Sequence, residues 1–161
     1  VLVVRVHPEI LQSQPLPSKT KADKKIWEKR FEDIRNFEKY LTRNGIHVIK
    51  FFLNVSKDEQ KKRFLERIEQ PEKNWKFSAN DVKERHFWDD YQKVYQEAMQ
   101  ETSTEKSPWY VIPADNKWFT RVTVSEIICQ HLEAMNLHYP ELDETQLKQL
   151  AEAKALLENE S

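Results

Sequence analysis

The segment of residues 46–55 constrains the fold most, because it is an almost unbroken run of apolar and aromatic side chains. Strands that are buried on both faces of a parallel sheet have this composition, so we predict a central strand here. A second, shorter strand is predicted at residues 109–112. The order of strong patterns, helix–strand–helix–helix–strand–helix, predicts an α/β fold with an open sheet.

Local signals mark where the predicted helices begin and end. Gly45 follows the first helical pattern, and a glycine there can adopt the left-handed conformation that ends a helix. Ser56 and Glu59 have the spacing of a capping box and open the next helix. We expect this helix to bury Phe64, Leu65 and Ile68. The helical patterns comprise residues 27–41, 56–68, 78–98, 118–135 and 143–157.

The N-terminal region is harder to interpret from its pattern. Residues 1–7 are apolar and β-branched, which predicts a buried strand, although a packed helical turn fits them equally well. Residues 12–21 contain Pro15 and Pro17 among polar residues and predict a surface loop. The chain opens inside an apolar segment without a methionine, so we expect it to be the interior of a longer protein.

Composition disfavours several functional classes. No apolar run approaches the ~18 residues of a membrane span, and no signal peptide is visible, so we expect a cytoplasmic protein without a membrane partner. The five scattered histidines predict no metal site. The single Cys129 lies on the apolar face of a predicted helix, so we expect a buried structural thiol.

Charge is distributed unevenly, although the net charge is only −1. Residues 57–85 contain nine Lys and Arg against seven Asp and Glu, whereas residues 136–161 contain two against six. The middle of the chain is therefore basic and the tail acidic. The total charge by itself predicts no polyanion binding.

Two arginines follow the first predicted strand. Arg63 and Arg67 are four residues apart, so they share one face of a helix. Two planar guanidinium groups on one face can bind several phosphate oxygens at once. The alternative is a solvated charged face, in which the nearby carboxylates pair with the arginines. These carboxylates are Asp58, Glu59, Glu66 and Glu69.

The second predicted strand also ends in polar residues. Asp115 follows Pro113 and precedes a helix, so it could cap that helix or lie beside a ligand at the carboxyl end of the sheet. Between the two strands, residues 71–91 alternate cations with aromatic side chains. This composition is typical of a hinged phosphate-binding lid, and an RNA-binding loop is the alternative.

These segments together closely resemble the polyphosphate kinase type 2 family, enzymes of P-loop kinase fold that move phosphate between inorganic polyphosphate and nucleotides. The resemblance covers the chain up to about Pro140. It rests on motifs in the family's order: Phe51-Phe52-Leu53, the helix from Glu59-Gln60 to Arg67-Ile68, Trp75-Lys76-Phe77-Ser78, Asp81-Val82-Lys83-Glu84-Arg85, Pro113-Ala114-Asp115, Lys117-Trp118-Phe119 and Arg121.

The resemblance implies a parallel sheet like that of thymidylate kinases, with a helical lid at about residues 71–104. Residues 1–140 would be the C-terminal part of the kinase domain, and residues 141–161 an acidic helical tail. Residues 1–7 would then follow a catalytic motif and could be helical. The resemblance implies that Arg67 and Arg63 take part in catalysis. It implies that polyphosphate is bound by Lys73, Lys76, Lys83 and Arg85, and the nucleotide by Asp115 and Lys117.

The resemblance also implies Mg²⁺, with ligands expected outside this chain. Gly45 is the only glycine, so the chain cannot hold the glycine-rich phosphate loop of such kinases. We therefore expect a phosphotransferase segment of a longer, homo-oligomeric protein that is inactive alone. The alternative is a non-catalytic remnant that binds polyphosphate or RNA, although the interspersed acidic residues disfavour nucleic acid.

Overall fold

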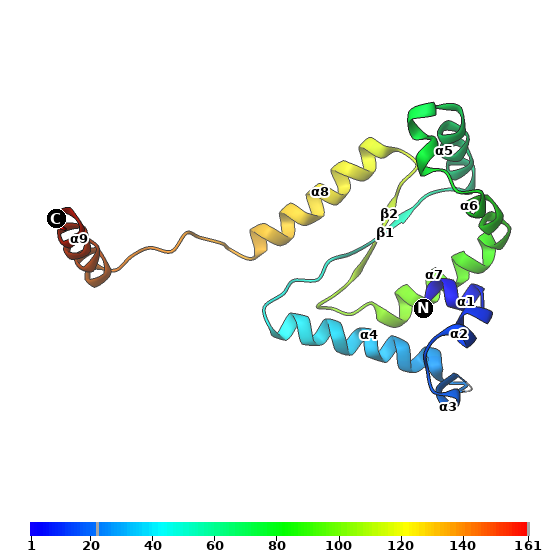
Figure 1. Ribbon diagram of the computed structural model, residues 1–161, viewed down its shortest axis with the longest axis horizontal. Coiled ribbons are helices and arrows are strands. Elements are labelled where there is room, and N and C mark those ends of the chain that lie inside the picture. The colour runs from blue at the N-terminus through cyan, green and yellow to red at the C-terminus, as the bar shows by residue number, and fades with distance from the viewer. Residues whose placement is uncertain (22, 161) are drawn as a thin grey trace. The chain divides into compact units, whose positions relative to one another are not determined.

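The computed structural model describes residues 1–21 and 23–160, and it divides into a unit of Val1–Glu126 and a second unit from Ile127 onward. Figure 1 labels the α-helices and the strands. Two short 3₁₀ helices, η1 and η2, lie between α5 and α7 on either side of α6. The elements are α1 (Leu2–Val6), α2 (Glu9–Ser13), α3 (Ser18–Lys21), α4 (Ile26–Arg43), β1 (Lys50–Asn54), α5 (Lys57–Glu69), η1 (Pro71–Lys76), α6 (Ala79–Glu84), η2 (Arg85–Phe87), α7 (Trp88–Thr102), β2 (Trp109–Pro113), α8 (Lys117–Ala134) and α9 (Glu144–Glu158).

The two strands form a small parallel sheet, as the sequence predicts. Lys50 of β1 lies opposite Trp109 of β2, and the register continues to the ends of both strands. Beyond the last pair, the Ala114 amide donates to the Asn54 carbonyl at 2.9 Å. The carboxyl ends of the strands therefore lie level, and α5 and α8 begin beside each other.

The predicted first strand is longer than the observed one. Residues 46–49 are not in a strand, and β1 begins at Lys50. Leu53 is 51 % exposed and Val111 is 54 % exposed. The prediction of a strand buried on both faces is thus wrong for this part of the chain, because no residue of β1 is fully buried.

A buried ion pair fastens α4 to the sheet. Lys50 Nζ lies 2.7 Å from the Glu38 carboxylate and donates to the Thr102 carbonyl, also at 2.7 Å. The same ammonium group lies 5.3 Å from the centre of the Trp109 ring. Both members of the pair are almost fully buried, so loss of either would cost about 3–5 kcal/mol. This contact joins α4, β1 and the end of α7.

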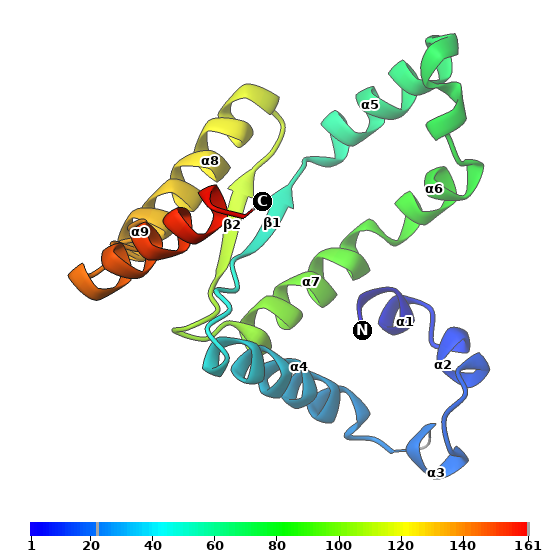
Figure 2. The ribbon, with the colours of Figure 1, turned by 60° about the vertical axis from the view of Figure 1, so that its left-hand side comes forward.

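Residues 1–7 are mainly helical, so the strand predicted there is wrong and the helical alternative is correct. The His7 amide donates to the Val3 carbonyl at 2.8 Å. Val4 is buried with Leu11 and Ile26 in a small core, and Arg5 is ion-paired with Glu97 of α7 at 2.5 Å. Figure 2 shows α1 alongside α7. Packing between helices therefore buries these apolar side chains. Among the described residues, this segment pairs with no strand.

The loop predicted at residues 12–21 is only partly correct. It includes the end of α2 and all of α3, and the segment around Pro15 is the non-helical part. The helix predicted next is present as α4, where Phe31 is 2 % exposed but Phe37 is 62 % exposed. Gly45 has φ of 82°, which confirms the left-handed position expected after that helix.

Figure 2 shows α5 leading away from β1, with α6 and α7 returning the chain toward the start of β2. Ser56 caps α5, and its Oγ accepts the Glu59 amide at 3.1 Å, but the Ser56 amide donates to Asp115, so only half of the predicted capping box is present. The Asn74 amide group donates to the carbonyls of Arg67 and Ile68 and holds η1 against the end of α5. The buried face expected for α5 is wrong, because α5 has no fully buried residue.

The second unit contains the end of α8 and the acidic helix α9. Asp143 and Gln146 form a complete capping box, which confirms the predicted start of the last helix. Cys129 is exposed, so the expected buried thiol is wrong, and no residue of α8 is buried. Over the residues that the structure describes, we find no helix with both the length and the apolar character that crossing a bilayer requires.

Candidate functional site

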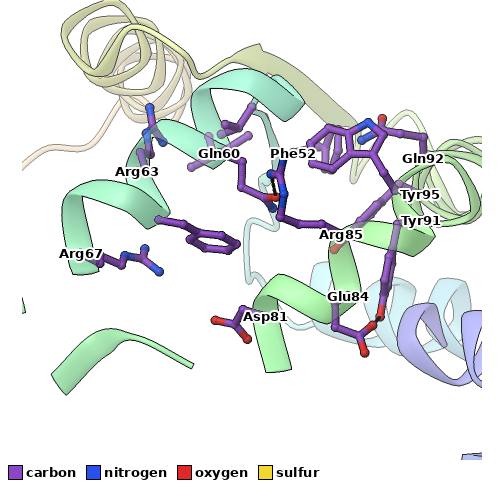
Figure 3. Close-up of a pocket in the computed structure, with 14 residues that line it drawn as sticks. Phe52, Gln60, Arg63, Arg67, Asp81, Glu84, Arg85, Tyr91, Gln92 and Tyr95 are labelled. Atoms are coloured by element: carbon purple, nitrogen blue, oxygen red, sulfur yellow. Dashed lines mark hydrogen bonds between the residues drawn. The ribbon is translucent and has the colours of Figure 1, made fainter. Parts of the chain in front are cut away.

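A cavity of about 420 Å³ lies beyond β1, where α5, α6, η2 and α7 converge. Figure 3 shows Arg63 and Arg67 on α5, with Glu84 and Arg85 across the cavity. Three arginines therefore line one cavity together with aromatic side chains. The lining residues are Phe52, Leu53, Val55, Gln60, Arg63, Phe64, Arg67, Asp81, Glu84, Arg85, Trp88, Tyr91, Gln92 and Tyr95.

Arg67 is the arginine that is most available to a ligand. Its guanidinium group lies 5.5 Å from the centre of the Phe64 ring, and the side chain is half-buried. Among the described residues it has no carboxylate partner. A guanidinium group that is held against an aromatic ring keeps its donors free for phosphate oxygens. The structure thus leaves Arg67 free for the role expected of it.

Arg63 is largely occupied by contacts within the protein. Its Nε donates to Glu59 at 2.9 Å, and its Nη2 donates to the carbonyls of Ala114 and Asp115 at 2.7 and 3.2 Å. The side chain therefore ties α5 to the turn after β2. The alternative of a charged face with paired carboxylates is correct in part for Arg63, which pairs with Glu59, and is wrong for Arg67.

Asp115 links the ends of the two strands. Its Oδ1 accepts the Ser56 amide at 2.7 Å, and this hydrogen bond lowers the pKa of the Asp115 carboxyl group. The expectation that Asp115 caps α8 is wrong, because Asn116 accepts the Phe119 amide at 3.1 Å instead. Lys117 is the exposed first residue of α8. Neither Asp115 nor Lys117 lines the cavity.

The residues predicted to bind polyphosphate, all within the predicted lid of residues 71–104, separate into two groups. Arg85 lines the cavity and donates to Gln60 at 2.5 Å and to the Lys57 carbonyl at 3.0 Å. The three lysines do not line it. Lys73 pairs with Glu66 and lowers the pKa of that carboxyl group, Lys76 lies 4.9 Å from the centre of the Trp75 ring, and Lys83 is exposed.

Comparison with known proteins identifies the family. The family model for polyphosphate kinase 2 (PPK2) matches residues 19–140. The chain belongs to the polyphosphate kinase 2 family. The resemblance inferred from the sequence motifs is therefore confirmed, and the cavity lies entirely within the matched residues.

Two relatives and one solved structure extend this result. The chain is 50 % identical over 157 residues to the ADP-polyphosphate phosphotransferase of Rhodopseudomonas palustris, covering 98 % of this chain and 54 % of the relative. It is 44 % identical over 141 residues to the AMP/ADP-polyphosphate phosphotransferase of Meiothermus ruber, covering 88 % and 48 %. The crystal structure of polyphosphate kinase 2 from Arthrobacter aurescens TC1 matches with a TM-score of 0.78 at 38 % identity, covering 94 % and 50 %.

The chain spans about half the length of these three polyphosphate kinase 2 relatives. The α/β fold with a small parallel sheet and its helices is shared with a solved member of the family over nearly the whole chain. These relatives are about twice as long as this chain, so similarity to them does not by itself assign their activity to it.

Sequence reasoning missed a polar cluster at the base of the cavity. His7 Nε2 lies 2.8 Å from the Glu84 carboxylate, which also accepts the Tyr91 hydroxyl at 2.7 Å. Burial and then the Glu84 hydrogen bond raise the pKa of Tyr91 to about 12. His7 and Glu84 are 77 residues apart, so no sequence spacing predicts their contact.

Mg²⁺, which the polyphosphate kinase 2 family implies, has no matching ligand set here. Within the described part of the chain, no three His, Cys, Asp or Glu side chains gather where they could share a metal ion. Of the two carboxylates at the cavity, Glu84 is already engaged by His7 and Tyr91. We therefore assign no chemical step through a metal to these residues.

Proposed function

We propose that this chain is the lid-bearing part of a phosphotransferase that moves phosphate between inorganic polyphosphate and a nucleoside mono- or diphosphate. The observation that carries the proposal is the cavity with Arg63, Arg67 and Arg85 on its wall, of which Arg67 has no carboxylate partner among the described residues. Its two relatives are named for transfer between polyphosphate and AMP or ADP, which supports these substrates.

The proposed fold is that of a P-loop kinase, similar to thymidylate kinase, with β1 and β2 as two strands of a larger parallel sheet. The cavity beyond β1 supports this, because open α/β sheets bind ligands outside the carboxyl ends of their strands. We propose that the kinase domain includes residues 1–140, that residues 71–104 are its lid, and that residues 141–161 are a separate acidic tail.

Arg67 is the proposed catalytic residue. Phosphoryl transfer relies on positioning and on neutralising charge that spreads over the equatorial oxygens. A guanidinium group can contact two of these oxygens at once. Arg63 has a supporting role in this proposal, because two of its three nitrogens already donate to Glu59 and to the turn after β2. It fixes the helix that presents Arg67.

The remaining predicted residues have proposed binding roles. Arg85 reaches the transferred phosphate or its neighbour from the opposite wall, and the lysines of the lid attract polyphosphate as it approaches. These lysines are Lys73, Lys76 and Lys83. Asp115 and Lys117 lie after β2, where we propose that they contact the nucleotide from the rim of the site.

We also propose that transfer needs residues beyond those described. The single Gly45 lies after α4, and the described residues offer no Mg²⁺ ligand set. When bound, Mg²⁺ neutralises phosphate charge, and its proposed ligands lie outside this chain. We further propose that the protein is a cytoplasmic homo-oligomer and that its partners include neither membranes nor nucleic acid.

A chimera tests the proposed function. The matched segment of the Rhodopseudomonas palustris relative is replaced by this chain, and ATP formation from ADP, polyphosphate and Mg²⁺ is followed. We expect turnover by the chimera and none above a protein-free blank by this chain alone. An inactive but folded chimera, together with binding of RNA in preference to polyphosphate by this chain, would instead support a non-catalytic binding protein.

A further inference from the structure

The cluster at the base of the cavity joins three helices and one 3₁₀ turn. His7 follows α1, Glu84 ends α6, and Tyr91 lies in the second turn of α7. The His7 ring also meets the edge of Phe87 of η2, with centres 4.8 Å apart and planes at 73°. The imidazole is mostly buried, at 16 % exposure, so its position is well defined by these neighbours.

The cluster continues directly into the phosphate-facing wall. Arg85 is the next residue after Glu84, and it donates to Gln60 and to the Lys57 carbonyl on α5. The junction of α6 and η2 is therefore held from two sides, by His7 and Tyr91 on one side and by α5 on the other. Figure 3 shows Glu84 bonded to Tyr91 and Arg85 turned toward Gln60.

Every charged group near His7 affects how it titrates. Glu84 faces it from α6, Glu9 faces it at 3.3 Å from α2, and Tyr91 of α7 shares the Glu84 carboxylate. Arg5 on its own helix is paired with Glu97. The Glu84 hydrogen bond raises the pKa of His7, and the His7 hydrogen bond lowers the pKa of Glu84.

The charge of His7 decides how much negative charge Glu84 presents to the cavity. With a protonated imidazole, the His7–Glu84 pair is neutral and its hydrogen bond is charge-assisted. With a neutral imidazole, an uncompensated carboxylate lines the same wall as Arg85 and repels an incoming polyanion. Histidine is the side chain suited to make this change near neutral pH.

We propose that His7 is a positioning residue for the lid, which fixes Glu84 and thereby Arg85 and makes phosphate binding in the cavity weaken as His7 loses its proton. This inference rests on the proposed function only in taking the ligand of the cavity to be a phosphate chain. The link between α1 and the lid is a property of the described contacts themselves.

The test compares two proteins at the same pH, so that the ionisation of the ligand affects both dissociation constants equally. Binding of tripolyphosphate is measured from pH 5.5 to 9 by this chain and by its His7→Gln variant. Below the raised pKa of His7, we expect the unchanged chain to bind about three- to fivefold more tightly, as for one partly exposed ion pair. The ratio should fall toward one as the pH rises through that pKa.

Two further variants separate this role from a merely structural one. In the Glu84→Gln background, His7→Gln should have no further effect, because the pair no longer exists. His7→Lys, which stays charged, should keep the tighter binding up to alkaline pH. His47→Gln, at an exposed histidine in the same unit, is the matched control and should match the unchanged chain at every pH.

An NMR titration of the His7 imidazole is the measurement that does not depend on any ligand. Its pKa should be raised in the unchanged chain and return toward the ordinary value in Glu84→Gln. An unraised pKa, or a His7→Gln effect on binding that is the same at all pH values, would overturn the proposal. Absence of tripolyphosphate binding with a raised, Glu84-dependent pKa would sink the phosphate role of the cavity and with it the binding half of this inference.

Discussion

Two arginines of α5, Arg63 and Arg67, have opposite roles. In the first half, Arg63 donates to Glu59 and to the carbonyls of Ala114 and Asp115, so the protein itself uses its hydrogen bonds. In the second half, Arg67 faces the cavity and has no carboxylate partner among the described residues. A structural arginine and an arginine that is open to ligand are thus only four positions apart on one helix.

This contrast shows what a shared helix face does and does not determine. The spacing of Arg63 and Arg67 places both on one side of α5. The difference comes from the turn after β2, whose carbonyls reach the first arginine only, because the parallel register brings that turn to the start of α5. Neighbouring segments thus decide which of two equivalent cations remains available.

The largest effect should follow loss of Arg67. In the active chimera, Arg67→Ala and Arg67→Lys should each lower kcat, by about 10³-fold for alanine, because the planar guanidinium group that stabilises the transition state is lost. Nucleotide affinity should change little. Steady-state kinetics check this, with Arg43→Ala at the exposed end of α4 as the control. Near-normal kcat with only a raised polyphosphate requirement would make Arg67 a guide residue.

Arg63→Ala should instead affect stability. It removes the donors of the Ala114 and Asp115 carbonyls and the partner of Glu59, which we expect to lower the free energy of unfolding by about 1–3 kcal/mol. Urea denaturation measures the change. Arg67→Ala serves as the matched variant on the same helix, and equal destabilisation by both substitutions would contradict the division between the structural arginine and the arginine that is open to ligand.

Asp115 should give the strand-end turn a characteristic pH dependence. The Ser56 amide lowers the pKa of Asp115, so the stabilisation is present above the unfolded pKa and is lost as the pH falls through the folded pKa. The unchanged chain should therefore unfold at higher temperature than Asp115→Asn at neutral pH, and the two should converge in acid. Asp33→Asn, at an exposed position of α4, should show no such convergence.

The smallest effects should come from the lid lysines. Lys83→Ala should weaken the apparent affinity for polyphosphate by a few-fold without changing kcat, because Lys83 is exposed and acts through charge alone. The difference should shrink as salt is added, since salt screens exposed charges. Titrations at two ionic strengths test this. Lys73→Ala should have the weaker effect, because Lys73 already pairs with Glu66.

Much of the fold follows from local sequence signals. The Ser56 cap, the position of Gly45 and the start at Asp143 are correct because each depends on residues within a few positions. Residues 1–7 and the length of β1 are not decided locally. A short apolar segment has the same sequence pattern whether it is buried as a strand or as a packed helix. Only the contacts of residues 1–7 with α7 and of β1 with β2 distinguish the two cases.

The site was predictable to a similar extent. The motifs indicated Arg67 and Arg85, and the structure places both on the cavity. The sequence could not show that Arg63 and Asp115 are occupied by the strand-end turn, because their partners are more than 50 residues away. His7 and Glu84 are 77 residues apart, farther still, and no sequence pattern links the two residues.

The most direct test of the account is an NMR titration of the arginine Nε–Hε signals with tripolyphosphate. Substitution of each arginine by lysine assigns the signals. We predict that the Arg67 signal shifts strongly and saturably, whereas the Arg63 signal, whose Nε already donates to Glu59, moves little. A saturable shift of Arg63 with an unchanged Arg67 would contradict the assignment of Arg67 as the phosphate-binding residue of the cavity.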